Sequence, residues 1–199
     1  MAKRYMLALE TRQVETKAML TALQTRKLTK LFSMYDTNCT GVLMREDFDQ
    51  LFKKMASVRN WSVRSPRCMV VQDLLTQMWN GLAKKADKSQ DKAVCLEEWL
   101  AFKTEVLASA QSYAQEVNAL MELVFDVFDQ DSDGKLSQTD WERLLSVYNV
   151  SPVYGAIAFP ALNPDADGLL TKECLLQWVQ AFYYSDTPDD PANGMFGPF

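Results

Sequence analysis

The twelve residues Asp129–Asp140 read DQDSDGKLSQTD, with aspartate at positions 1, 3, 5 and 12 and glycine at position 6. Calcium binds six to eight hard oxygen ligands, and a twelve-residue loop between two helices supplies them from these positions, with glycine at the sharp turn. The segment therefore predicts a calcium-binding loop flanked by helices. A single match to such a pattern is weak support, so the prediction depends on whether the pattern recurs.

The pattern recurs three more times with the same flanks. Position 8 is aliphatic in every copy, the residue after each loop is apolar, and another apolar residue follows three positions later. This spacing predicts a buried stripe on each helix that leaves a loop. The further copies are Asp36–Asp47 (DTNCTGVLMRED), Asp87–Glu98 (DKSQDKAVCLEE) and Asn163–Cys174 (NPDADGLLTKEC). Four copies in series predict an all-α fold with four EF-hand helix-loop-helix units, in two pairs that form a compact globular protein.

Each loop is expected to lie between an incoming and an outgoing helix. Pro66 marks a break before the second unit, and Pro160 lies inside the fourth incoming helix, which should therefore be short or kinked. The expected incoming helices are Leu20–Tyr35, Val70–Lys85, Ala114–Phe128 and Pro152–Leu162. The expected outgoing helices are Arg45–Arg59, Leu96–Ser109, Gln138–Tyr148 and Lys172–Tyr184.

The repeat divides the chain into two pairs of units and two ends. Residues 21–110 contain the first pair, residues 111–184 contain the second, and residues 1–20 form an N-terminal extension. Residues 185–199 begin as a polar stretch broken by proline and end on Met195, Phe196 and Phe199. Burial of such side chains is favourable, so we expect this tail to fold back over apolar surface between the pairs.

The third loop has the highest density of carboxylates. Its position 12 is Asp140, where glutamate is usual, and the aspartate side chain is one methylene shorter. With a single oxygen on the ion, the site loses affinity for calcium and accommodates the smaller, six-coordinate magnesium better. We therefore expect magnesium to compete here. The candidate ligands are Asp129, Asp131, Asp133 and Asp140.

The second loop keeps the usual glutamate at position 12 but has Lys92 in place of glycine at position 6. A residue other than glycine in the left-handed conformation costs about 1 kcal/mol or more, which the free energy of ion binding can offset. We therefore expect this loop to bind calcium. Its candidate ligands are Asp87, Ser89, Asp91 and Glu98.

The first and fourth loops are weaker candidates for different reasons. The first loop has oxygen at every ligand position but only two carboxylates, so it attracts a cation less strongly. The fourth loop ends on Cys174, and a thiol is a poor ligand for a hard cation, so we expect this loop to act mainly as a structural partner of the third. The candidate ligands of the first loop are Asp36, Asn38, Thr40 and Asp47.

The composition argues against several other classes of protein. A net charge of −5 over 199 residues disfavours nucleic acid and anionic membranes as partners. No apolar run approaches the roughly 20 residues that span a bilayer, so we expect no stable membrane insertion. The chain has no histidine, the commonest general base, and we expect no enzymatic activity. Four widely spaced cysteines fit free thiols, which predicts a cytoplasmic protein.

The segment Trp79–Phe102 (WNGLAKKADKSQDKAVCLEEWLAF) resembles the second EF-hand of invertebrate sarcoplasmic calcium-binding proteins and of calexcitin. The ending Asn193–Phe199 (NGMFGPF) is similar to the tail of that family. The resemblance covers about residues 21–199 and implies cytosolic calcium buffering, or calcium signalling in nerve and muscle. It also implies that the side chains named above are ligands, and that position 7 of the first three loops adds a backbone carbonyl. These carbonyls belong to Val42, Ala93 and Lys135.

These observations leave two roles open. We expect a monomeric calcium buffer or signalling protein that holds two or three calcium ions. The alternative is a calmodulin-like sensor that presents a methionine-rich apolar groove to a target protein. The ten methionines are scattered along the chain, which favours a role as core filling. A carrier of a small organic ligand would share the fold, but the light-emitting site of photoproteins relies on histidine, which is missing here.

Overall fold

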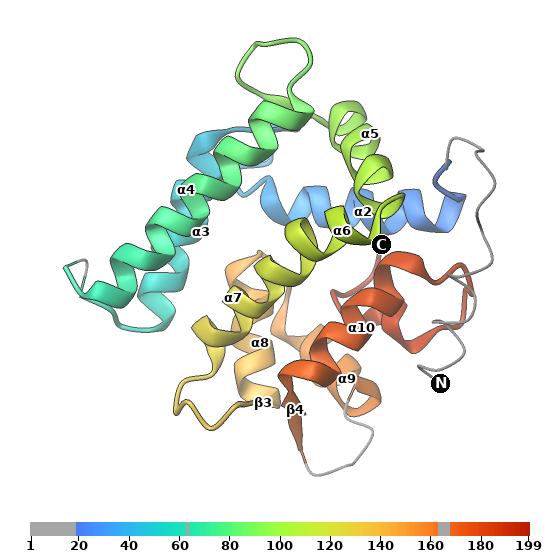
Figure 1. Ribbon diagram of the computed structural model, residues 1–199. Coiled ribbons are helices and arrows are strands. Elements are labelled where there is room, and N and C mark those ends of the chain that lie inside the picture. The colour runs from blue at the N-terminus through green and yellow to red at the C-terminus, as the bar shows by residue number, and fades with distance from the viewer. Residues whose placement is uncertain (1–18, 63, 163–167) are drawn as a thin grey trace.

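The structure, a computed structural model, describes residues 19–62, 64–162 and 168–199. It is mostly helical, and helices lie on both sides of each of the four loop segments (Figure 1). The expected all-α class is therefore confirmed. The first half of the chain contains α2 (Ala22–Tyr35), β1 (Val42–Leu43), α3 (Arg45–Val58), α4 (Pro66–Ala86), β2 (Val94–Cys95) and α5 (Leu96–Leu107).

The second half repeats this order after an additional helical segment. The Ser109 hydroxyl accepts the N–H of Ser112, so the chain is already helical before Ala114, where the sequence predicts the third incoming helix to start. The elements are α6 (Ala110–Tyr113), a π-helical turn η1 (Ala114–Asn118), α7 (Ala119–Phe128), β3 (Lys135–Ser137), α8 (Gln138–Val147), α9 (Pro152–Leu162), β4 (Leu169–Thr171), α10 (Lys172–Tyr184) and a 3-10 helix η2 (Pro191–Gly194).

Helix α4 begins four residues earlier than the sequence analysis predicts. The predicted start at Val70 is wrong because Ser65 caps the helix: its hydroxyl accepts the N–H of Cys68 at 3.2 Å. Pro66 then occupies the first helical position, where the missing N–H has no cost. The break that proline indicates is therefore also the start of the helix.

Two short antiparallel ladders connect the loops in pairs. Strand β1 pairs with β2 through Leu43 and Val94, and β3 pairs with β4 through Leu136 and Leu170. These four residues stand at position 8 of their loops, and all are fully buried. Their aliphatic side chains face the core while positions 3 and 5 of the first three loops are exposed, so the ladders attach the loops to the core and leave them open to an ion.

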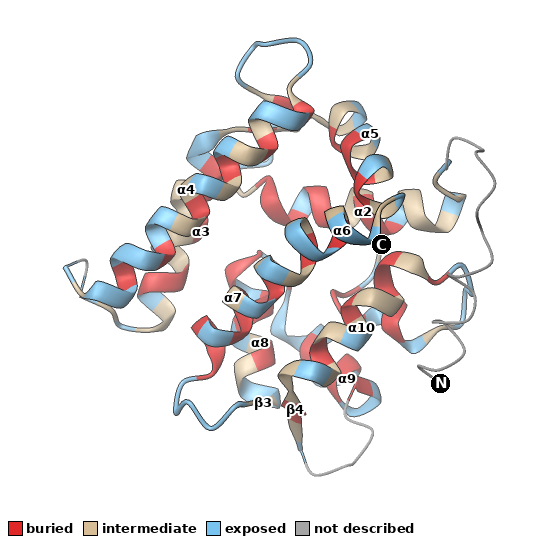
Figure 2. Ribbon diagram, viewed as in Figure 1, coloured by how far each residue is buried: buried red, intermediate tan, exposed pale blue. Residues whose placement is uncertain are grey.

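The core continues from the first half of the chain into the second. Tyr35, the last residue of α2, packs on Phe48 and Trp99 with ring centroids 5.9 and 5.7 Å away. The same ring meets Tyr148, which follows α8, edge-on at 5.7 Å. Buried residues line the inner faces of the helices in both halves (Figure 2). The two halves therefore share one hydrophobic cluster. Because protein interiors are close-packed, a displacement of side chains in one half strains the packing of the other.

The apolar end of the tail lies inside this cluster. Met195 and Phe196 are buried, and the ring of Phe196 lies 5.0 Å from that of Phe182 and 6.0 Å from that of Trp141. Helices α8 and α10 supply these two partners. Burying a methionine and a phenylalanine contributes roughly 3–6 kcal/mol before the cost of ordering the chain.

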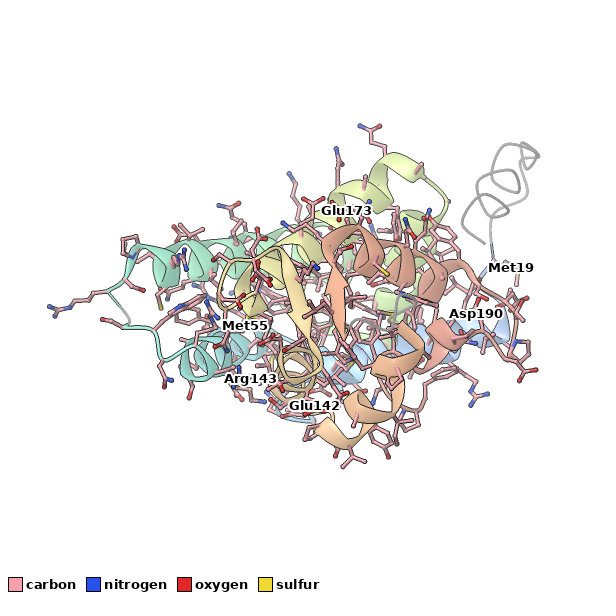
Figure 3. The ribbon with its side chains drawn as sticks, turned by 90° about the horizontal axis from the view of Figure 1, so that it is seen from below. Met19, Met55, Glu142, Arg143, Glu173 and Asp190 are labelled. Carbon is pink, nitrogen blue, oxygen red and sulfur yellow. The ribbon has the colours of Figure 1, made fainter. Side chains whose placement is uncertain are left out.

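Polar contacts attach the tail to helix α2. The buried ammonium of Lys27 donates to the carbonyl of Ser185 at 2.7 Å and to Oδ1 of Asn193 at 3.2 Å. Burial lowers the pKa of Lys27 to about 8, against the opposing charges of acidic residues in the tail. Thr21 Oγ1 donates to Asp186 at 2.7 Å, so the start of α2 and the tail meet at the end of the molecule where Figure 3 labels Met19 and Asp190.

Candidate metal centres

The first three loops share one backbone conformation. Positions 4 and 6 adopt the left-handed region in each of them, with φ between 57° and 82°. Glycine takes this conformation readily, whereas other residues enter it at a cost of about 1 kcal/mol. The residues at position 4 are Cys39, Gln90 and Ser132, and those at position 6 are Gly41, Lys92 and Gly134. The common backbone conformation shows that the three loops are copies of one structural motif in spite of their different sequences.

The aspartate at position 1 holds each of these loops in its turn. Oδ1 and Oδ2 of Asp36 accept the N–H groups of Thr40 and Gly41 at 2.9 and 2.8 Å. Asp129 makes the same two bonds to positions 5 and 6 of the third loop, at 3.2 and 3.0 Å. Hydrogen bonds to a charged acceptor are stronger than neutral ones. The loops are therefore organised around the carboxylate that would also meet the ion.

The second loop reaches this geometry with lysine at position 6. Oδ2 of Asp87 accepts the N–H of Lys92 at 3.0 Å, and Lys92 has φ +68°. Oδ1 of Asp91 accepts the N–H of Ala93 at 2.9 Å, as Asp133 does for Lys135 in the third loop at 2.8 Å. The charge-assisted bond to Asp87 offsets the cost of the left-handed backbone at a residue with a side chain.

The side chain at position 12 of the first loop connects the beginning of the loop to its end. The Asp47 carboxylate is fully buried, and its Oδ1 accepts both the N–H and the hydroxyl of Thr37, at 3.0 and 3.1 Å. Oδ2 accepts the N–H of Met44 at 2.9 Å. An aspartate is therefore long enough to bridge positions 2 and 9 of this loop. Thr37 was missed in the sequence analysis, because position 2 is not a ligand position.

Position 12 of the second loop makes an equivalent bridge. Oε1 of Glu98 accepts the N–H groups of Lys88 and Ser89 at 3.0 and 3.1 Å, and Oε2 accepts that of Cys95 at 3.1 Å. Desolvation raises the pKa of this carboxyl, but the three N–H groups outweigh it and hold the pKa below its usual value. Glu98 thus stays ionised and faces the first turn of its loop.

Position 12 of the third loop shares the bond to the position 9 N–H with the other two loops, but its second oxygen does not reach the start of the loop. Oδ2 of Asp140 accepts the N–H and the hydroxyl of Ser137, at 3.0 and 2.6 Å, which forms a capping box at the start of α8. Oδ1 lies 3.5 Å from Nη1 of Arg143, one turn further along the helix. Within the described chain, the side-chain oxygens of Asp140 bond only these two residues. Sequence reasoning missed both partners, although an arginine three positions after an aspartate on a helix is a recognisable signal.

The third loop nevertheless brings three carboxylates together. Ligand atoms of Asp129, Asp131 and Asp133 lie within 4.8 Å of one another. Asp129 is buried and the other two are exposed. Among the described residues, this is the group of acidic side chains that is compact enough to hold one cation. Oxygen-only donors in such a group suit calcium or magnesium.

The beginning of the fourth loop, residues 163–167, lies outside the described residues. Of its remainder, Gly168 has φ +79°, as position 6 does elsewhere. The thiol of Cys174 donates to the carbonyl of Leu162 at 3.7 Å, and Nε1 of Trp178 donates to the same oxygen at 2.7 Å. The thiol at position 12 of this loop therefore donates a hydrogen bond to the last carbonyl of α9, which is a structural role.

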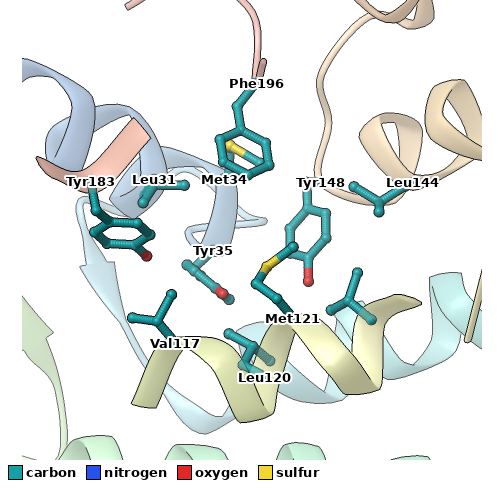
Figure 4. Close-up of a pocket in the computed structure, with 11 residues that line it drawn as sticks. Leu31, Met34, Tyr35, Val117, Leu120, Met121, Leu144, Tyr148, Tyr183 and Phe196 are labelled. Atoms are coloured by element: carbon teal, nitrogen blue, oxygen red, sulfur yellow. The ribbon is translucent and has the colours of Figure 1, made fainter. Parts of the chain in front are cut away.

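A small cavity lies where the two halves of the chain meet (Figure 4). Its volume is about 20 Å³, which is room for a single water molecule. Tyr35 and Tyr148 face it from the two halves, and Phe196 of the tail covers one side. Burial raises the pKa of both tyrosines, so both stay neutral at physiological pH.

Comparison with known proteins identifies two relatives by sequence. No family model matches the chain. Calerythrin of Saccharopolyspora erythraea is 22% identical over 169 residues, which cover 83% of this chain and 95% of calerythrin. Sarcoplasmic calcium-binding proteins I, III and IV of Branchiostoma lanceolatum are 29% identical over 92 residues, 46% of this chain and 50% of theirs. Both are homologues of this chain.

A solved structure agrees with these relatives. The sarcoplasmic calcium-binding protein of amphioxus superposes with a TM-score of 0.73 at 17% identity, over 90% of this chain and 100% of that protein. At this identity the match establishes a common fold. The resemblance to sarcoplasmic calcium-binding proteins that the sequence indicates is thereby confirmed.

Proposed function

We propose that this chain, a homologue of calerythrin and of the sarcoplasmic calcium-binding proteins, is a calcium buffer or calcium-signalling protein without catalytic activity. The common backbone of the first three loops is the observation that carries the proposal. Each of these loops also has an aspartate at position 1 and a carboxylate at position 12. An oxygen-rich loop of twelve residues suits a hard divalent cation.

Two or three calcium ions are proposed to bind, in the first three loops of four EF-hand units arranged as two pairs. The side chains at positions 1, 3, 5 and 12 and the carbonyl at position 7 supply the oxygens. The fourth loop is assigned a structural role, because a thiol at position 12 is unsuited to calcium. The proposed ligands are Asp36, Asn38, Thr40, Val42, Asp47, Asp87, Ser89, Asp91, Ala93, Glu98, Asp129, Asp131, Asp133, Lys135 and Asp140.

Magnesium is proposed to compete at the third site. Asp140 is short, and Ser137 and Arg143 hold it at the start of α8. With one oxygen at most from position 12, the site fits the octahedral coordination of magnesium better than the larger shell of calcium. The second site, where Glu98 bridges the loop with both oxygens, is expected to prefer calcium.

The tail favours a buffer over the alternative, a calmodulin-like sensor with a target protein. Phe196 occupies apolar surface between α8 and α10, where a target helix would otherwise dock. Met55 and Met121 are buried, although Met69 is 55% exposed. The central cavity holds about one water, which is too small for an organic ligand.

The remaining properties are proposed from charge and composition. An acidic chain with four widely spaced cysteines fits a monomer in the cytoplasm with no nucleic-acid partner. Across the described ranges, no helix combines the length and the apolar character that crossing a membrane requires.

Calorimetric titration with calcium, with and without millimolar magnesium, tests the function. The expected result is saturable binding of two or three ions, with magnesium weakening one of them selectively. Absence of saturable calcium binding would contradict the proposal.

Deleting residues 194–199 tests the role of the tail. The truncated protein should melt at a lower temperature and bind more of a hydrophobic dye in calcium, because Phe196 no longer covers its apolar partners. The matched control is Phe199→Ala, which changes a less buried ring at the same end. Equal melting and dye binding in the truncated and full-length proteins would contradict a closed buffer.

A further inference from the structure

The end of α8 touches the first loop on both sides of its first ligand. The ring of Tyr148 packs edge-on against Tyr35, the residue before Asp36. Nδ2 of Asn149, the next residue, donates to the carbonyl of Thr37, the residue after Asp36, at 3.3 Å. Two consecutive residues from the second half of the chain therefore hold the position at which a loop of the first half begins.

A second contact fixes the orientation of the Asn149 side chain. Nζ of Lys54, on α3, donates to Oδ1 of Asn149 at 2.6 Å. An ammonium group can only donate, so the oxygen of the amide must face Lys54 and its nitrogen must face the Thr37 carbonyl. The assignment of the two amide atoms thus follows from the chemistry of the partners.

Thr37 transmits this contact to position 12 of the loop. Its N–H and its hydroxyl both donate to Oδ1 of Asp47, at 3.0 and 3.1 Å. The contacts thus run from Asn149 to Thr37 and from Thr37 to Asp47. Asn149 touches neither Asp36 nor Asp47 in any hydrogen bond of the described chain, so it acts through Thr37.

We propose that Asn149 is a positioning residue of the first calcium site, so that the affinity of this site depends on a residue from the opposite pair of units. The inference rests on the proposed function, since it assumes that the first loop binds calcium. Among the first three loops, it also gives the one with the fewest ligand carboxylates a stabilising contact from outside its own sequence.

The first half of the chain contains a matched control. Asn60 follows α3 as Asn149 follows α8, and both have left-handed backbones, with φ +50° and +58°. Their N–H groups bond the carbonyls of Ser57 and Ser146 at 3.1 and 3.2 Å. The Asn60 side chain makes no hydrogen bond within the described chain. Replacing each asparagine by glycine preserves the left-handed turn and removes the side chain.

The test is a calcium titration of the full-length protein followed by NMR at the amides of Gly41 and Gly134, which report the first and third loops separately. Asn149→Gly should raise the calcium midpoint at Gly41 by about three- to tenfold, the effect of one hydrogen bond, and leave Gly134 unchanged. Asn60→Gly should change neither midpoint. Lys54→Met should shift Gly41 in the same direction as Asn149→Gly, with Lys53→Met as its control.

Three results would overturn the inference. An unchanged midpoint at Gly41 in Asn149→Gly shows that the contact has no role in binding. Equal shifts at both glycines, reproduced by Asn60→Gly, show a general loss of stability. If calcium moves neither amide in the unmodified protein, the proposed function fails first, and this outcome is distinct from the other two.

Discussion

The second and third loops reach the same backbone from opposite sequences. The third has glycine at position 6 and aspartate at positions 1, 3, 5 and 12, whereas the second has Lys92 at position 6 and serine at position 3. Yet Glu98 bridges the second loop with both oxygens, while Asp140 bonds Ser137 and Arg143 at the start of its own helix. The third loop thus has more carboxylates, but its position 12 side chain does not bridge the loop as that of the second loop does.

The first loop shows that length alone does not explain this difference. Asp47 is also an aspartate, and it reaches Thr37 across the loop. Position 9 of the first loop is methionine, which offers no hydroxyl, whereas the third loop has Ser137 there. Partners near position 12 therefore decide, together with side-chain length, whether the carboxylate closes the loop. Affinity and selectivity should follow this closure and not the number of carboxylates.

Among the variants that test this comparison, Glu98→Gln should change ion binding most. It removes the charge that accepts three backbone N–H groups, so the second site should lose about 3 kcal/mol, or roughly 100-fold in affinity. Calorimetry would then find one ion fewer. Glu97→Gln is the control, because Glu97 is exposed and its side chain is not the one that accepts the backbone N–H groups of the loop. Unchanged stoichiometry in Glu98→Gln would show that the second loop does not bind.

Asp140→Glu should come next, with about a tenfold gain in the preference of the third site for calcium over magnesium. The longer side chain can pass Ser137 and present two oxygens to the ion. Competition titrations of the two metals measure the change, and the second site serves as the internal reference. Identical selectivity in the two proteins would refute the role assigned to Asp140.

Lys92→Gly should have a smaller effect, on stability. Removing the side chain at φ +68° relieves strain, and the free energy of unfolding should rise by about 0.5–1 kcal/mol after the entropy cost of glycine. Denaturant unfolding measures it. Lys92→Gln is the control, since it removes the charge and retains the strain. A glutamine variant as stable as the glycine variant would assign the effect to charge.

Arg143→Gln should have the smallest effect. The guanidinium is about half exposed, so its pair with Asp140 contributes at most about 1 kcal/mol, and calcium affinity at the third site should rise about two- to threefold. Arg45→Gln is the control, since Arg45 pairs with Asp49 on α3. A fall in affinity for Arg143→Gln would mean that the pair orients Asp140 toward the ion.

Periodicity in the sequence located the helices well. The apolar residue at position 8 and the stripe after each loop are local signals, and the structure buries all four position 8 residues. The start of α4 was missed because Pro66 was interpreted as a break, whereas it occupies the first helical position after the Ser65 cap. The helical residues 110–113 were missed because no loop follows them directly.

The partners of the candidate ligands were harder to predict. Ser137 and Arg143 are near Asp140 in sequence, so their contacts could have been inferred from spacing on a helix. Asn149 is 112 positions from Thr37, and no local pattern links them. Such a contact depends on how the two halves pack, which a single sequence does not encode in any short-range signal.

A crystal structure grown in calcium would test the central claim most directly. The account predicts ions in the first three loops, with both oxygens of Glu98 on the second ion and a single oxygen of Asp140 on the third. An empty third loop, or two Asp140 oxygens on its ion, would contradict the conclusion that position 12 and its neighbours set how each loop binds.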